Sequence, residues 1–245
     1  MKIPSPYSRK SRTDKLFYKA GAGAFHQMRL YLESMDELLQ VQRQRIERDR
    51  RKHLKKYPQD WQLIEEFSDG DIARVDGYFT NVLLNSSFMA SFALFESVFQ
   101  KVCFRTAYKY FQEPDFNSGP GIINKYRSYL SSILRNDFAQ ADLSWQDILR
   151  YSELRNAIVH HGSIGTKKDI LLLIPFLKKH NFITVKKIRN TSKYRFTITD
   201  KKFIYEFLAC VSKFIRDILF ELPPGRRKKL PHQIAARPKI SATGQ

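Results

Sequence analysis

An arginine, an asparagine and two histidines lie close together in the segment Leu154–Gly162, which reads LRNAIVHHG. An arginine can clamp a phosphate with its fork of donors, a histidine can move a proton near neutral pH, and an amide can orient either group. These groups together can cut RNA without a metal, with the ribose 2′-OH as the nucleophile. We therefore take Arg155, Asn156 and His160 as the candidate catalytic residues.

The apolar spacing before this segment predicts a helix over residues 144–160, with Ser144 as its N-cap. On that helix Asn156 and His160 are four residues apart and share a face. The long side chain of Arg155 can reach the same place. His161 is a supporting candidate, although its side chain points elsewhere on a helix.

The same residues also fit an ordinary helix C-terminus. Two histidines would favour the negative end of the helix dipole, and Gly162 would take the left-handed position after the last turn. Arg155 would then be a solvated or paired surface residue. The two interpretations are compatible, because a site can lie at the end of a helix.

The arrangement Arg155-Asn156-x-x-x-His160 resembles the signature of HEPN-domain ribonucleases. The resemblance implies a helical core, a metal-independent endoribonuclease and a homodimer whose two motifs face each other across the interface. It also implies that Arg155 and His160 form the catalytic pair, with Asn156 assisting. Some toxins of the family carry a modifiable tyrosine two residues after the histidine, where this chain has Gly162, so the resemblance does not extend to that mode of control.

A second candidate residue is Glu96, which interrupts an apolar stripe on the helix predicted over residues 82–111. A carboxylate inside such a stripe must be paired or hydrogen-bonded, since burying it bare is costly. Arg155 is one possible partner, which would fix the arginine in place. Another Lys or Arg, or a position at the edge of the stripe, would satisfy Glu96 equally well. The Phe-Glu pair upstream of the motif also resembles the HEPN layout.

Composition points to a polyanionic partner, either nucleic acid or an anionic membrane surface, and the motif leads us to expect RNA. The chain has 245 residues and a net charge of +19. Its two cysteines, Cys103 and Cys210, lie on apolar helices and are typical of a reduced, cytoplasmic protein. No metal-ligand cluster is evident, so we expect no cofactor and no metal. No long uncharged apolar run or signal peptide is evident either, so we expect no membrane partner.

Two basic segments could bind RNA. The first is the second half of a long helix predicted over residues 24–57, although such a charge run could equally be a solvated face or could pair with a copy of itself. The second is a two-stranded hairpin predicted from the β-rich runs 182–185 and 194–199, which could instead only cover the core. The RNA-binding candidates are Arg48, Arg51, Lys52, Lys55, Lys186, Lys187 and Arg189.

These elements predict a mainly α fold, a HEPN-like helical bundle with a long N-terminal helix and a small β-hairpin before the last helix. We expect a flexible basic arm (1–20), a long helix and connector (21–79) with a turn at 68–71, a helical domain (80–222) and a basic disordered tail (223–245). Within the domain we expect a loop (112–121) and helices over 122–135 and 200–221.

The leading functional hypothesis is a metal-independent endoribonuclease, which the resemblance places in a toxin or phage-defence setting with a possible antitoxin or regulatory protein. The alternative is a non-catalytic helical module that binds nucleic acid or a partner protein and in which the motif is structural. A membrane-surface role is disfavoured, because the basic half of the long helix lacks a broad apolar face.

Overall fold

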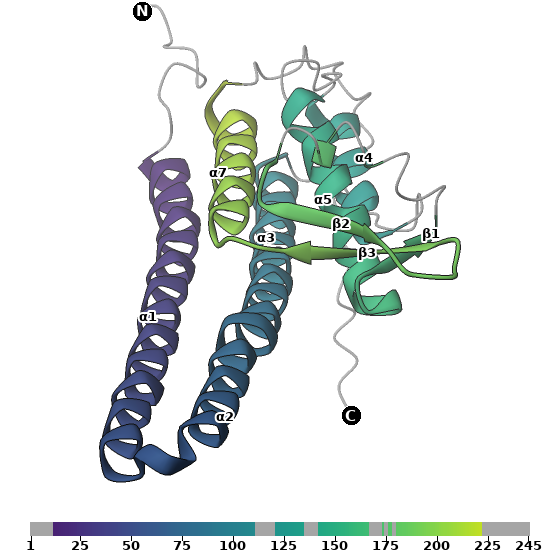
Figure 1. The fold of residues 1–245 in the computed structure, drawn as a ribbon. Coiled ribbons are helices and arrows are strands. Elements are labelled where there is room, and N and C mark those ends of the chain that lie inside the picture. The colour runs from purple at the N-terminus through teal and green to yellow at the C-terminus, as the bar shows by residue number, and fades with distance from the viewer. Residues whose placement is uncertain are drawn as a thin grey trace, which may run out of the picture.

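The computed structural model describes residues 12–110, 121–134, 142–166, 173, 176–177 and 180–221. It confirms the predicted fold class, since the protein is mainly helical, with a long N-terminal helix and a small antiparallel sheet before the last helix (Figure 1). Most of the predicted loop (112–121) lies outside the described residues, which resume at Gly121. The predicted tail (223–245) and the first eleven residues of the predicted arm also lie outside them.

Helix α1 spans Arg12–Lys56 and therefore begins inside the segment expected as a flexible arm (1–20). The cause is tertiary, because the Asp14 carboxylate lies 2.8 Å from the Arg105 guanidinium on a neighbouring helix. Two aromatic side chains of the same turns also pack against the core, namely Phe17 and Tyr18. This part of the predicted arm is helical and anchored.

The connector after α1 is helical throughout, and no turn interrupts it at residues 68–71. A 3-10 turn, η1 (Pro58–Asp60), reverses the chain. Three helical segments then follow without a break: α2 (Trp61–Ala73), the π-helical turn η2 (Arg74–Phe79) and α3 (Thr80–Tyr110). Figure 1 shows this continuous helix running antiparallel to α1, with η1 at the lower end of the view.

Ion pairs between α1 and α2 explain why the expected turn is helical. The Arg50 guanidinium contacts the carboxylates of both Glu65 and Asp69, which are one helical turn apart. Nearer the core, Arg43 lies 3.4 Å from Asp76. Since residues four apart share a helix face, this pairing favours helix where the local Ser-Asp-Gly-Asp sequence favours a turn.

The core lies between α3, α5 (Asp142–His161) and α7 (Lys202–Arg216), with α4 (Ile122–Leu134) packed on α3. The chain continues from α7 into the π-helical turn η3 (Asp217–Glu221). Aromatic rings fill the space between the three helices, and each is less than 2% exposed: Phe88, Phe92, Phe95, Phe99, Trp145, Tyr151, Phe203, Phe207 and Phe214. The helices predicted from apolar spacing over 82–111, 144–160 and 200–221 are confirmed.

The sheet has three strands, where the sequence predicted two. Strands β2 (Ile183–Lys187) and β3 (Lys193–Ile198) form the expected hairpin. The additional strand is β1 (Ile164–Thr166), which follows α5 directly and pairs with the other edge of β3. The strand order is therefore β1-β3-β2, fully antiparallel.

One described helix, Pro58–Thr106, is long and apolar enough to cross a membrane by length and composition, with a mean hydropathy of 1.5 in its most apolar window. The expectation from the sequence was that no such run is present. In this structure 44% of that window is buried inside the protein. The aromatic stripe of α3, which contains Phe88 and Phe92, contributes to this burial by packing against α7.

Candidate functional site

Helix α5 divides cleanly into a buried face and an outer face. Trp145, Ile148, Tyr151 and Leu154 are each at most 1% exposed and anchor the helix in the core. Asn156 and His160 are exposed on the final turns of α5. Arg155 is partly exposed. The helix therefore presents the three motif residues at the surface on a rigid support.

Two contacts fix the Arg155 side chain. Its Nη1 donates a hydrogen bond to Oδ1 of Asn156 at 3.0 Å. Its Cζ lies 5.9 Å from the centroid of the Phe92 ring on α3, within the range of a cation–π contact. The Asn156 amide and the Phe92 ring therefore both hold the Arg155 side chain in place.

The Phe92 contact was not predicted, although the sequence contained a signal for it. Phe92 and Glu96 are four residues apart on α3 and so share one face of that helix. Since Glu96 is a candidate partner for Arg155, the position of Phe92 on the same helix face was the signal for this contact.

Glu96 interacts with Arg155 by charge alone. Among the described residues no hydrogen bond or ion pair joins the two side chains, so the proposed direct pairing is not formed. Burial of the half-exposed Glu96 carboxyl raises its pKa, and the nearby positive charge of Arg155 offsets only part of that rise. The Glu96 carboxyl near Arg155 therefore loses its proton less readily than an exposed glutamate does.

His160 lies on the last turn of α5, four residues after Asn156 and on the same exposed face. The side chain of His161 lies outside the described residues. Gly162 has a left-handed backbone, with φ of +56°, as the helix C-terminus interpretation predicted. Ser163 is also left-handed, and its N–H donates to the Ala157 carbonyl at 3.1 Å.

The helix end places the motif beside the basic sheet. Strand β1 begins two residues after Gly162, and its Ile164 pairs with Arg195 of β3, which in turn pairs with Lys186 of β2. Neighbouring strands are about 4.8 Å apart, so Lys186 lies roughly 10 Å across the sheet from β1. Residues 181–199 contain five Lys or Arg and no acidic residue: Lys186, Lys187, Arg189, Lys193 and Arg195.

The RNA-binding candidates on the long helix α1 are not brought to the motif. Arg48, Arg51, Lys52 and Lys55 are all exposed on the far half of α1. Figure 1 shows that end of α1 at the bottom of the view, away from β1 and the end of α5. The sequence could not distinguish these locations, because the two basic runs are similar in charge density and only the fold separates them.

A third histidine, His180, lies under α5 and was not considered from the sequence. It is 5% exposed, its Nδ1 contacts the Glu206 carboxylate, and it packs against Tyr151 and Phe176. Its Nε2 is buried and has no partner among the described atoms. Because RNA could not reach a ring this deeply buried, we assign His180 to the core.

Within the part of the chain that the structure describes, no three His, Cys, Asp or Glu residues are grouped closely enough to hold a metal ion. Comparison of the chain with protein-family models, with curated proteins and with solved structures gave no match.

Proposed function

We propose that this protein is a HEPN-like endoribonuclease that cleaves RNA by attack of the ribose 2′-OH, without a metal. The observation that carries the proposal is the end of α5, where Asn156 and Phe92 hold the Arg155 guanidinium and the exposed His160 follows five residues later on the same helix. Preorganised charge of this kind is the main source of rate enhancement in phosphoryl chemistry. The resemblance of the motif supports a toxin or phage-defence setting, with an antitoxin or other regulatory protein as a partner.

In the proposed reaction, His160 accepts the proton of the 2′-OH as the 2′-oxygen attacks the adjacent phosphorus. The phosphorus–5′-oxygen bond then breaks, and the leaving oxygen takes a proton from an acid. Arg155 offsets the negative charge that builds on the phosphate oxygens. The products are a 2′,3′-cyclic phosphate and a 5′-hydroxyl end.

The reaction needs two proton transfers, while one motif offers one histidine on its exposed face. A two-fold symmetric dimer with facing motifs provides both, because His160 of the partner subunit can then act as the acid. The proposal thus includes a homodimer that is required for full activity.

The basic sheet supports the same proposal, since it can hold the RNA backbone beside the motif. Lys186 and Arg195 are exposed neighbours across β2 and β3, so their charges act at one place. Phosphate contacts of this type position a nucleic acid without reading its bases.

The test compares the wild type with His160→Ala, and uses His26→Ala, an exposed histidine on α1, as the matched control. Each protein is incubated in EDTA with a labelled structured RNA and with total tRNA. We expect fragments ending in a cyclic phosphate from the wild type and from His26→Ala only. Equal cleavage by His160→Ala would refute the assignment of the catalytic histidine.

The alternative function is a non-catalytic module that binds nucleic acid. The observation that favours it is the β2–β3 region, residues 181–199, which has basic but no acidic residues. In that case the wild type and His160→Ala bind RNA equally and neither cuts it. A gel-shift titration against salt then measures how many phosphates the protein contacts.

A further inference from the structure

The helical hairpin formed by α1 and α2 extends well beyond the core. Among the described residues, the last ion pair between α1 and the start of α7 joins Asp36 to Lys201, the residue before α7, at 2.6 Å. We define the distal hairpin as residues 37–82, that is, the part beyond this pair. The α1 arm of this region, residues 37–56, extends about 30 Å at 1.5 Å per residue.

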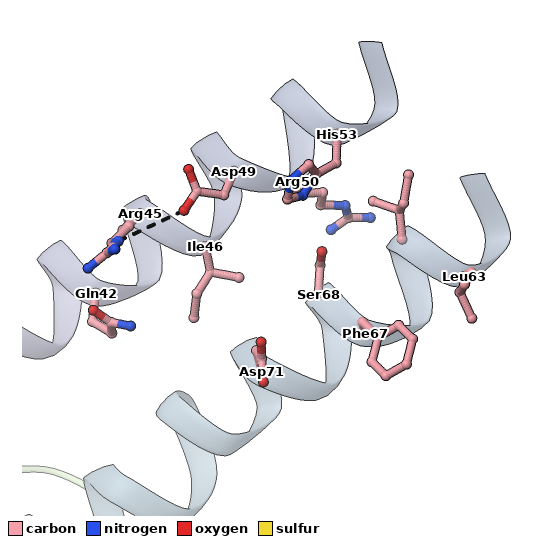
Figure 2. A pocket seen from close by; sticks show the side chains of 11 residues that line it. Gln42, Arg45, Ile46, Asp49, Arg50, His53, Leu63, Phe67, Ser68 and Asp71 are labelled. Atoms are coloured by element: carbon pink, nitrogen blue, oxygen red, sulfur yellow. Dashed lines mark ion pairs between the residues drawn. The ribbon is translucent and has the colours of Figure 1, made fainter. Parts of the chain in front are cut away.

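One face of the distal hairpin is open and carries exposed apolar side chains among charged and polar ones. A groove of about 560 Å³ runs along it, lined on α1 by Gln42, Arg45, Asp49 and His53 and on α2 by Leu63 and Phe67, among others (Figure 2). Leu38 lies four residues before Gln42 and so extends the same side of α1.

Tyr78 continues this face across the π-helical turn. Phe67 follows the groove-lining Ile64 by three residues, and Tyr78 follows the buried Val75 by three. Both aromatic residues therefore lie on the same side of the continuous helix. Phe67 is 67% exposed and Tyr78 is 65% exposed. We call Leu38, Leu63, Phe67, Gly70, Tyr78 and Val82 the apolar face.

Gly70 lies seven residues after Leu63, within the apolar face. It is in the middle of an exposed helix, where glycine is less favourable than alanine by about 0.5–1 kcal/mol. A Cβ added there would meet nothing within 4 Å inside the chain. The space above Gly70 is open for a side chain from another molecule.

The charges of the distal hairpin are self-complementary. Its α1 arm (37–56) has eight Lys or Arg and three acidic residues, and the opposite arm (57–82) has one Arg and six acidic residues. The arms thus carry +5 and −5, and the distal hairpin is neutral in a chain of net charge +19. Net charge repulsion between two copies is therefore weak at the distal hairpin.

We propose that the apolar face binds the same face of a second copy of this chain, giving a four-helix bundle. Two hairpins can stack face to face about a two-fold axis along their length or across it. An axis across the hairpins sets each basic arm on the partner's basic arm. An axis along the hairpins sets each basic arm on an acidic arm, so charge selects this arrangement and brings both tips to one end.

The size of the face suits such a contact. Two packed helices are about 20 Å wide, so a face about 30 Å long covers roughly 600 Å² per partner. Stable interfaces bury about 600–1,000 Å² per partner, so the face reaches the lower end of this range. Aromatic anchors such as Phe67 and Tyr78 are the residue types that dominate binding at such interfaces.

The first test measures self-association of the full chain, purified free of nucleic acid, by sedimentation equilibrium. The variant Phe67→Glu/Tyr78→Glu places charges on the apolar face. Leu16→Glu, an exposed apolar residue of α1 outside the distal hairpin, is the matched control. We expect the face variant to raise the dimer dissociation constant by on the order of 100-fold or more, and the control to leave it unchanged.

A monomeric wild type overturns the proposal, as does an unchanged dissociation constant in a face variant whose circular dichroism matches the wild type. If the face variant unfolds, Gly70→Cys decides. With the axis along the hairpins, the two Gly70 positions lie at the same height, and a short bismaleimide joins two copies. Failure of Gly70→Cys to cross-link refutes the arrangement. None of these measurements depends on RNA cleavage.

Discussion

Gly162→Ala tests the helix end on which the candidate site depends. Gly162 has φ of +56°, a conformation that costs an L residue with a Cβ about 1–2 kcal/mol. A Cβ at this position would meet nothing within 4 Å, so no steric clash adds to the cost. Alanine also restricts the unfolded chain more than glycine does, which stabilises the folded protein by about 0.4–1 kcal/mol. We therefore expect Gly162→Ala to lower the free energy of unfolding by about 1 kcal/mol.

Urea denaturation of the full chain, followed by circular dichroism, measures this change. Gly23→Ala is the control of opposite sign, because Gly23 lies within α1 with open space around it, and alanine favours a helix interior by about 0.5–1 kcal/mol. Gly162→Asn should cost less than Gly162→Ala, since asparagine tolerates the left-handed region. If Gly162→Ala were as stable as the wild type, the left-handed end of α5 would be wrong.

Three further predictions concern the Glu96 carboxyl, the basic sheet and the core. Because burial raises the folded-state pKa of Glu96 above its unfolded value, the wild type loses stability as the pH rises through the folded pKa. Glu96→Gln should therefore be the more stable protein at pH 7 and match the wild type in acid, and lower stability at pH 7 would show that attraction to Arg155 outweighs burial. Lys186→Ala/Arg195→Ala should reduce the slope of log binding constant against log salt by about 1.4–1.8, as expected for two lost phosphate contacts, while the exposed Lys101→Ala leaves it unchanged; equal slopes would exclude the sheet. Phe207→Ala should cost about 3–5 kcal/mol in urea denaturation, because the ring is fully buried and stacks on Phe92 at 5.4 Å; a loss below about 1 kcal/mol would contradict the described core.

Long apolar periodicity made the core helices predictable from the sequence. The stripe of aromatic residues on α3 and the spacing on α7 both predict the observed buried faces, since a helix of this length must bury one side. The left-handed conformation of Gly162 was predictable for a similar local reason, because many helices end at a glycine in this conformation.

Features that depend on distant residues were not predictable. The turn signal at residues 68–71 yields to pairing of Asp69 with Arg50 on another helix. Strand β1 is three residues long and exists through its pairing with β3, some thirty residues later in the chain. At the site, the sequence offered Arg155 as one of several possible partners for Glu96 but could not show that Asn156 and Phe92 make the direct contacts with Arg155.

The continuous helix from α2 to α3 also has a mechanical consequence. Its tip carries Phe67, and its far half carries Phe92 under the Arg155 guanidinium. A straight α-helix is stiff along its axis, and bends concentrate where the hydrogen-bond pattern changes, as at a π-helical turn. A sideways force on the tip must therefore either bend the helix at the π-helical turn Arg74–Phe79 or displace Phe92, which packs against the Arg155 guanidinium.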